Sequence, residues 1–407
     1  MKKTFPLPLF ISIKYFFTLT GIPYFYVVNP LKNTSMHLHN LSLVNFKNYQ
    51  QADFEFSPRI NCLVGNNGGG KTNVLDAIHY LCMCKSYFNA VDTQNIRTGC
   101  EFSVIQGAFS LPERTEEIYC AIQRMRNKVF KRNKKEYDRL SDHIGLIPVV
   151  VISPADSCLI TEGSDERRKF MNSVISQYDH HYLEDNIHYN HLLLQRNKLL
   201  KDVSPSGRFD EGTLVAYDEQ IIPYAERIYA GRQDFISKLV PVFRKYYAFI
   251  SGGQEAVDLA YHSQLVNNSF PDMLREARNK DRILQYSTVG VHKDDLTLSL
   301  DDLPIKRIGS QGQQKTYLVA LKLAQFDFIK EINKTVPIFL FDDIFDKFDE
   351  KRVTQIIKLV AEEHFGQIFI THTDPLRMKD IIHEIGVDFK FFHIENGQVE
   401  KEDRNGH

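Results

Sequence analysis

Residues 65–72 constrain the fold of this chain more than any other stretch, because they fit the pattern G-x-x-x-x-G-K-[ST]. Glycines in such a loop let the backbone curl, so that successive N–H groups point at phosphate oxygens. The lysine then places a positive charge on the β- and γ-phosphates, and the hydroxyl after it is expected to ligate Mg²⁺. The residues predicted to bind the nucleotide are Gly65, Asn66, Asn67, Gly68, Gly69, Gly70, Lys71 and Thr72.

The sequence on either side of this loop supports the same interpretation. An alternating apolar segment over 59–64 predicts a strand before the loop, and apolar periodicity predicts a helix over 72–84 after it. The positive end of that helix adds to the attraction for phosphate. A flexible glycine loop without a ligand is the alternative, but the strand–loop–helix order favours an ATP-binding loop.

A second candidate element is the apolar strand over 336–341, which ends in two carboxylates. Asp342 is predicted to hold Mg²⁺ opposite Thr72, usually through water. Asp343 is then placed to orient or deprotonate the attacking water, which makes Asp343 and Lys71 predicted catalytic residues. Neighbouring side chains on a strand point to opposite faces, so one carboxylate must lie beyond the strand end. An ordinary strand exit with solvated acids is the alternative.

A third element is the glutamine-rich segment 308–316, which precedes an apolar helix. Ser310 stands where a helix N-cap belongs. Gly309 and Gly312 leave the N–H groups of the helix start open to a close ligand, so the segment can hold a second phosphate group. The alternative is a capped helix and nothing more.

The S-x-G-Q core of this segment is similar to the signature of ATP-binding-cassette proteins, and its full form with Lys315 resembles the RecF family of recombination-mediator ATPases. Departures from the family pattern are Val291 in place of proline, and Lys293 and Lys315 in place of arginine. The resemblance runs from about Met36 to near the end of the chain. Further matching segments are 43–49, 163–170, 195–197, 290–296 and 340–349.

The resemblance implies an α/β fold: a P-loop NTPase of the ATP-binding-cassette head type, with a mixed sheet lobe and an inserted helical lobe. We assign 36–160 and 286–407 to the nucleotide-binding sheet lobe. Residues 161–285 are assigned to the helical lobe, since Leu, Arg, Glu, Gln and Tyr recur there at helical spacing.

The resemblance also implies that two chains close around ATP. The signature of one chain would cap the nucleotide on the phosphate loop of the other, as an ATP-dependent homodimer. His372 would occupy the switch position that senses the γ-phosphate, so the predicted catalytic residues are Asp343, Lys71 and His372. Residues 346–349 would form the D-loop at the dimer seam. The residue equivalent to the cassette Q-loop stays unassigned. The signature residues concerned are Ser310, Gln311, Gly312 and Gln313.

DNA is the implied macromolecular partner, in gapped or double-stranded form and at junctions of single strand and duplex. RecR and RecO are the implied protein partners in loading a recombinase at gaps. The net charge is only −1, so DNA contact must come from local basic patches and be backbone-directed. The candidate patches are Arg124, Arg126, Lys128, Lys131, Arg132, Lys134 and Lys135, and the run Arg167, Arg168 and Lys169.

Three alternative functions stay open. A transporter ATPase would carry the L-S-G-G-Q signature, and a chromosome-maintenance head would need long heptad arms. An ATP-bound DNA clamp with negligible hydrolysis is a third, since Asp343 stands where transporters commonly carry Glu. The histidines of 180–191 are interpreted as structural or surface residues beside a core run at 192–194, not as a metal site.

The remaining expectations concern the start of the chain and its compartment. Residues 1–35 differ from the rest, and Met36 is the expected translation start, which would make 1–35 a non-native or disordered extension. No run of about 18 apolar residues follows, so no membrane partner is expected. The six cysteines lack C-x-x-C pairs, which favours reduced thiols and a cytoplasmic location.

Overall fold

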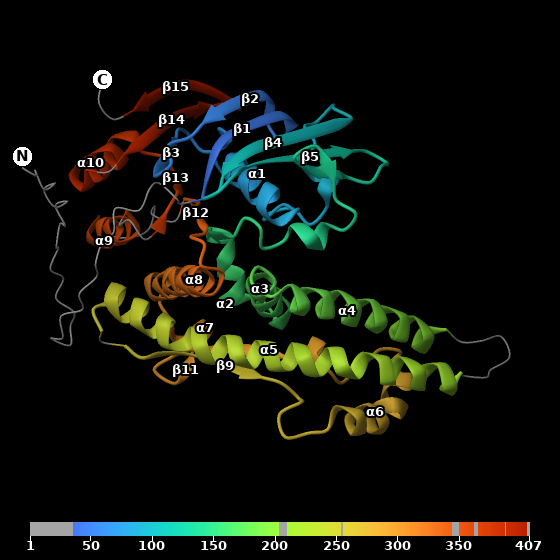
Figure 1. Cartoon of the computed structure of the whole chain (residues 1–407). Helices are drawn as coiled ribbons and strands as arrows, with labels where there is room; N and C mark the ends of the chain where they lie inside the picture. The colour runs from blue at the N-terminus through green and yellow to red at the C-terminus, as the bar shows by residue number, and fades with distance from the viewer. Residues whose placement is uncertain are drawn as a thin grey trace, which may run out of the picture.

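The computed structural model of the chain describes residues 36–202, 210–253, 255–343, 350–361, 365–386 and 388–404. The expected extension 1–35 and the expected D-loop 346–349 lie outside the described residues. The described chain forms an upper lobe of two sheets around one helix and a lower lobe that is mainly helical (Figure 1).

The sheet that carries the phosphate loop has the strand order β15-β14-β3-β13-β12-β8. Five of its strands run parallel, and only the edge strand β15 is antiparallel. Strands covered on both faces read as continuous apolar runs, which explains Val149–Ile152 and Ile338–Phe341. The bounds are β3 Ile60–Val64, β8 Val149–Ile152, β12 Ile338–Phe341, β13 Ile368–His372, β14 Phe389–Glu395 and β15 Gln398–Arg404.

The second sheet is antiparallel, in the order β2-β1-β4-β5-β6-β7. Buried and open residues alternate along β4 and β5, because only one face of this sheet packs on the core. Helix α1 (Lys71–Met83) shares a single apolar core with both sheets, so the helix after the phosphate loop is almost entirely buried. The bounds are β1 His37–Phe46, β2 Tyr49–Glu55, β4 Phe102–Ser110, β5 Thr115–Gln123, β6 Val129–Arg132 and β7 Lys135–Glu136.

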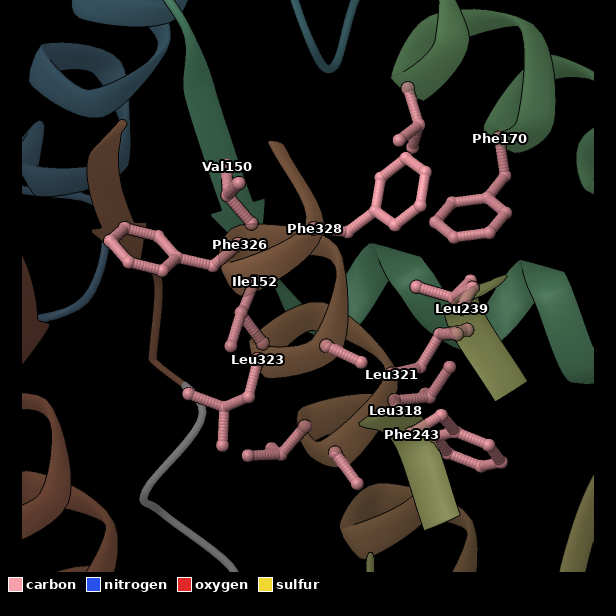
Figure 2. Packing of buried hydrophobic residues seen from close by; sticks show 14 of the residues in the cluster. Val150, Ile152, Phe170, Leu239, Phe243, Leu318, Leu321, Leu323, Phe326 and Phe328 are labelled. Carbon is pink, nitrogen blue, oxygen red and sulfur yellow. The ribbon is translucent and has the colours of Figure 1, made fainter. Parts of the chain in front are cut away.

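Helix α8 (Gln311–Asn333) joins the two lobes. On one side Phe326 stacks on the ring of Phe339 in β12, with 5.0 Å between the ring centres, while Figure 2 shows Leu318 and Leu321 near Leu239 and Phe243 of α5 on the other side. Burying each such side chain contributes about 1.5–3 kcal/mol to stability. Helix α8, which begins at the signature residues, is therefore packed firmly against both lobes. The other helices are α2 Cys158–Thr161, α3 Ser164–Ile175, α4 His180–Lys201, α5 Glu211–Ser251, α6 Phe270–Leu284, α7 Ile305–Ile308, α9 Glu350–Ala361 and α10 Pro375–Ile385.

The lower lobe also contains strands. β9 (Val257–His262), inside the segment assigned to the helical lobe, pairs with β10 (Asp295–Leu300), and β11 (Leu303–Pro304) completes a three-stranded sheet. This pairing crosses the boundary drawn at 285/286 from the sequence. Four short 3₁₀ helices complete the elements: η1 Asp92–Asn95, η2 Leu140–His143, η3 Pro154–Ser157 and η4 Val291–Lys293.

Several sequence-based expectations can be compared with the fold. All six cysteines are free thiols, and Cys62, Cys82, Cys84 and Cys120 are buried. The run 192–194 was expected to lie in the core, but Leu194 is 70% exposed. His188 stacks on the ring of Tyr224. Across the described ranges, no helix combines the length and apolarity needed to cross a membrane.

Candidate nucleotide site

The phosphate loop joins the end of β3 to the start of α1, and its glycines are required by close packing. Gly65, Gly68 and Gly70 have φ angles of 140°, 79° and 120°, a region that other residues rarely adopt. A Cβ on Gly70 would lie 2.7 Å from Asn48 Nδ2 and 2.9 Å from the Tyr49 hydroxyl. The loop is therefore fixed by contact with neighbouring backbone and side chains.

Residues outside the phosphate loop donate hydrogen bonds to its carbonyl groups. Asn48 Nδ2 donates to the Gly69 carbonyl at 3.0 Å, and the Gly397 N–H donates to the same oxygen at 2.8 Å. The Tyr49 hydroxyl donates to the Gly70 carbonyl at 3.2 Å. Since no side chain caps α1, the N–H groups of Lys71 and Thr72 stay available for an anion, whereas the Asn73 N–H donates to the Gly70 carbonyl at 3.0 Å.

Lys71 is 3% exposed, and its ammonium donates to the carbonyl groups of Gly65 at 2.8 Å and Asn66 at 3.0 Å. No carboxylate pairs with it within the described part of the chain. A buried ammonium held only by neutral carbonyls lacks a compensating negative charge. A phosphate group in the loop would supply that charge.

Thr72 and Asp342 meet as predicted. The Thr72 hydroxyl donates to Asp342 Oδ1 at 2.7 Å, and the Thr371 hydroxyl donates to the same oxygen at 3.1 Å. The Ser153 hydroxyl reaches Asp342 Oδ2 at 3.4 Å. Burial, and then the charge of Asp343, raise the pKa of the Asp342 carboxyl. Its hydrogen-bond partners among the described residues are neutral hydroxyls and its charged neighbour Asp343 is a second carboxylate, so the residues fit a divalent cation there.

Asp343 lies beyond the strand end, which settles how two adjacent carboxylates can serve one site. Its φ is 41°, a left-handed conformation that turns the chain after β12. Its N–H donates to the Thr371 hydroxyl at 2.8 Å. The side chain is half-buried and directly follows Asp342, so it lies at the same sheet edge as the Thr72–Asp342 pair.

His372 ends β13 and pairs in register with Val64, the residue directly before the phosphate loop. Its Nδ1 lies 2.8 Å from the Asp374 backbone nitrogen and 3.1 Å from the Asp374 carbonyl oxygen; in the tautomer with the ring proton on Nε2, Nδ1 accepts the Asp374 N–H. Nε2 is buried and has no hydrogen-bond partner among the described residues. A buried donor beside the loop costs about 1–3 kcal/mol when it is unpaired, so His372 is suited to donate to a phosphate oxygen.

The signature residues do not join this site within one chain. Ser310 caps α8 through a reciprocal box: its hydroxyl accepts the Gln313 N–H at 3.2 Å, and Gln313 Oε1 accepts the Ser310 N–H at 2.7 Å. Ser310 and Gln311 are exposed, and Gly312 is half-buried. The start of α8, marked by α7 in Figure 1, lies in the lower lobe, whereas the phosphate loop lies in the upper lobe.

The structure adds residues that the sequence analysis missed. Ser153 follows β8, which lies beside β12 in the sheet, and its hydroxyl contacts Asp342. Next to it, Asp156 pairs with Lys322 of α8 at 2.7 Å, and both side chains are buried. Tyr87 donates a hydrogen bond to the same carboxylate. The apolar run that ends at Ser153 was the available signal, because parallel strands end at one sheet edge.

The basic segments are less free than expected. Arg167 pairs with Asp295 at 2.7 Å, Arg168 with Asp165, and Lys169 with Glu166 at 2.6 Å, so the run 167–169 does not form an open basic patch.

The basic segment 124–135, which we call the hairpin, is divided in the same way. Lys128 turns inward to the Cys84 carbonyl at 2.6 Å, and Arg132 is bound by the buried Glu116. Arg126, Lys134 and Lys135 remain exposed, without a salt bridge to the described residues.

Comparisons with known proteins agree with this geometry. The family model described as the RecF/RecN/SMC N terminal domain matches residues 37–392. The DNA replication and repair protein RecF of Bacteroides fragilis is 51% identical over 365 residues, covering 89% of this chain and 98% of the relative. The RecF protein of Flavobacterium johnsoniae is 49% identical over 359 residues, covering 88% of this chain and all of the relative.

Solved structures show the same relationship. The recombination mediator protein RecF with ATP, of the RecFOR pathway, superposes with a TM-score of 0.82 at 26% identity, over 93% of this chain and 100% of that one. The Smc head of Pyrococcus furiosus, with a TM-score of 0.53 at 18% identity over 91% of this chain and 96% of that one, shares the fold. The chain therefore belongs to the RecF family of DNA replication and repair proteins within the RecF/RecN/SMC group.

Proposed function

We propose that this chain is a weak ATPase that dimerises on ATP, binds gapped or duplex DNA, and helps to load a recombinase at gaps in the cytoplasm. RecO and RecR are the proposed protein partners, since a structural relative is described as part of the RecFOR pathway. The observation that carries the proposal is the meeting of Lys71, the Thr72–Asp342 pair and the unpaired His372 Nε2 at one sheet edge.

Each of these groups has a proposed role toward the nucleotide. The N–H groups of 65–72 and the Lys71 ammonium hold the phosphates, and His372 Nε2–H donates to the γ-phosphate. Thr72 and Asp342 hold Mg²⁺, which neutralises charge that develops on the phosphate oxygens. Asp343 orients the attacking water.

We propose that the second half of the site comes from another copy of the chain. Ser310 and the Gly312 N–H are open at a helix start, where an anion is favoured, yet they lie away from the phosphate loop of their own chain. A partner copy that places this helix start over the triphosphate would complete the site. ATP bound between two chains stabilises the dimer by mass action.

Ser310→Arg is expected to abolish ATP-dependent dimers while ATP binding stays within about twofold, because a large cation at the helix start blocks the second chain and opposes the helix dipole. Gel filtration with light scattering, with and without ATP, measures the first effect, and fluorescent-nucleotide titration measures the second. Lys245→Arg, an exposed site on α5, serves as the control. ATP-dependent dimers of the Ser310→Arg chain would contradict capping in trans.

The exposed side chains of the hairpin are the proposed DNA contacts. Arg126 precedes β6, Lys134 lies in the turn after it and Lys135 begins β7, while Lys131 of β6 adds its ammonium over the Tyr119 ring. Cations without intramolecular partners are free to neutralise backbone phosphates. No base-reading element is required for this mode of binding.

Arg126→Ala combined with Lys134→Ala is expected to weaken duplex binding by about tenfold at low salt. Each lost phosphate contact should also lower the slope of log K against log salt by about 0.9, so the slope should fall by about 1.8. Anisotropy titrations across salt concentrations measure both values. Lys245→Ala with Lys280→Ala removes the same charge from exposed positions on α5 and α6 and should change neither. An unchanged slope in the hairpin variant would exclude these two side chains as DNA contacts.

A further inference from the structure

A polar cleft of about 490 Å³ lies in the lower lobe, away from the phosphate loop. Its size is within the range of small-ligand sites, which are typically about 300–1,000 Å³. Helices α3, α4 and α5 and the short η4 form its wall. We call it the amide cleft, and its lining residues are Ser164, Asp165, Arg168, Asn172, Asn186, Tyr189, Asn190, Arg232, His292 and Lys293.

Most hydrogen-bond acceptors in this wall are already occupied. Asn172 Oδ1 accepts from Arg232 Nη2 at 3.0 Å and from the Tyr182 hydroxyl at 2.6 Å. The single carboxylate of the wall, Asp165, binds Arg168. His292 Nδ1 accepts the Tyr189 hydroxyl at 2.6 Å.

The Asn186 and Asn190 amides complete this pattern. Asn186 Oδ1 accepts Asn190 Nδ2 at 2.7 Å. Asn190 Oδ1 is the one side-chain amide acceptor of the wall that the described residues leave open.

Several donors of the same wall have no partner within the described residues. Arg232 can only donate, so it fixes the Asn172 oxygen toward itself and leaves the Nδ2 donor of Asn172 uncommitted. Asn186 is 8% exposed, and its Nδ2 donor also lacks an acceptor. The Lys293 ammonium lies 5.0 Å from the centre of the Tyr286 ring and has no carboxylate partner. These amide nitrogens and the Lys293 ammonium can all donate into the cleft, so the wall is suited to a ligand rich in acceptors.

The charges of the cleft favour an anion. Arg232 is balanced by Asp294 at 2.7 Å, and Arg168 by Asp165, so the Lys293 charge remains in excess. The start of α3 has no side-chain cap beside Ser164, but its first turn carries Asp165 and Glu166, whose charges are balanced by Arg168 and Lys169. Donors of this kind and an unbalanced cation match the oxygens of a phosphate group.

We propose that the amide cleft binds a phosphate monoester, carried either on the end of a DNA strand or on a free nucleotide. The volume leaves room for the nucleoside attached to the phosphate, which a bare anion would not use. The DNA source rests on the proposed function, whereas binding of a free nucleotide does not. Asn172, Asn186 and Lys293 are the contacts.

The test uses the full chain with a non-hydrolysable ATP analogue present, so that the phosphate loop is filled. Anisotropy compares gapped duplexes whose strand ends at the gap carry a 5′-phosphate, a 3′-phosphate or only hydroxyl groups. Calorimetry titrates a deoxynucleoside monophosphate and its nucleoside. Two variants are measured: Lys293→Gln removes the charge, and Asn172→Asp keeps the acceptor toward Arg232 but turns the free donor into a negatively charged acceptor. Lys245→Gln is the matched control.

We expect about tenfold tighter binding of a phosphorylated end, or of the monophosphate over its nucleoside, and loss of that preference in both variants but not in the control. A preference seen only with strand ends identifies DNA as the source, and one seen only with the monophosphate identifies a nucleotide. No phosphate preference in either assay, or a preference unchanged in both variants, overturns the proposal. Failure of the unmodified chain to bind any duplex would instead contradict the proposed function, while the monophosphate titration still decides the cleft.

Discussion

Replacing Lys71 by alanine is expected to weaken ATP binding by at least about a hundredfold. The ammonium is 3% exposed and is held by the Gly65 and Asn66 carbonyl groups, which cannot neutralise it. In the nucleotide complex we expect two charge-assisted contacts with phosphate oxygens, each contributing about 1.5–3 kcal/mol. Loss of about 3 kcal/mol corresponds to more than a hundredfold in affinity.

Titration with a fluorescent ATP analogue in the presence of Mg²⁺ measures this loss. Circular dichroism and the thermal midpoint show whether the variant stays folded, since two hydrogen bonds to the loop disappear with the side chain. Lys71→Arg keeps the charge but needs more room in a loop closed by Asn48 and Tyr49, so it should lose affinity as well. Lys245→Ala controls for the loss of one positive charge. An ATP affinity unchanged in a folded Lys71→Ala chain would show that residues 65–72 are only a structural turn.

The nucleotide site could be predicted from sequence because its parts are short and regular. A glycine loop between a strand and a helix predicts a phosphate-binding turn, and an apolar strand that ends in acids predicts carboxylates at a sheet edge. The parallel sheet then brings Thr72 within 2.7 Å of Asp342 although 270 positions separate them. The same rule explains why β13 delivers His372 beside Val64, the last residue before the loop.

Other parts of the molecule could not be predicted, because they depend on which side chains meet across the fold. The run Arg167 to Lys169 reads as a basic patch, but Asp295, Asp165 and Glu166 neutralise it. Lys128 likewise turns inward to a backbone carbonyl.

The strands of the lower lobe show the same limit. The pairing of β9 with β10 is set by tertiary contact across 30 or more positions, and the residue patterns of the two segments do not reveal it.

Asp343→Asn is expected to slow ATP hydrolysis by about 10²–10³-fold, because proton transfer to a positioned base typically contributes 10²–10⁴-fold. The substitution leaves the backbone nearly undisturbed, since asparagine tolerates the left-handed conformation that the φ of 41° requires. The Oδ1 of the asparagine can still accept a hydrogen bond from the Thr371 hydroxyl, which lies 3.3 Å from Asp343 Oδ1 in the unaltered chain. ATP binding and ATP-dependent dimers should therefore persist, and the dimers should last longer than those of the unaltered chain.

Single-turnover hydrolysis, nucleotide titration and gel filtration separate these effects. Asp342→Asn is the informative comparison, because the loss of a buried carboxylate beside Thr72 should raise the Mg²⁺ concentration needed for ATP binding, whereas Asp343→Asn should not. If the unaltered chain hydrolyses ATP and Asp343→Asn hydrolyses it at the same rate, Asp343 is excluded as the base. Negligible turnover in the unaltered chain would instead favour the alternative of an ATP-bound DNA clamp, in which closure of the dimer is the functional event and hydrolysis contributes little. Comparison of the Asp342 and Asp343 variants thus distinguishes a DNA-binding dimer that ATP hydrolysis opens from one that stays closed.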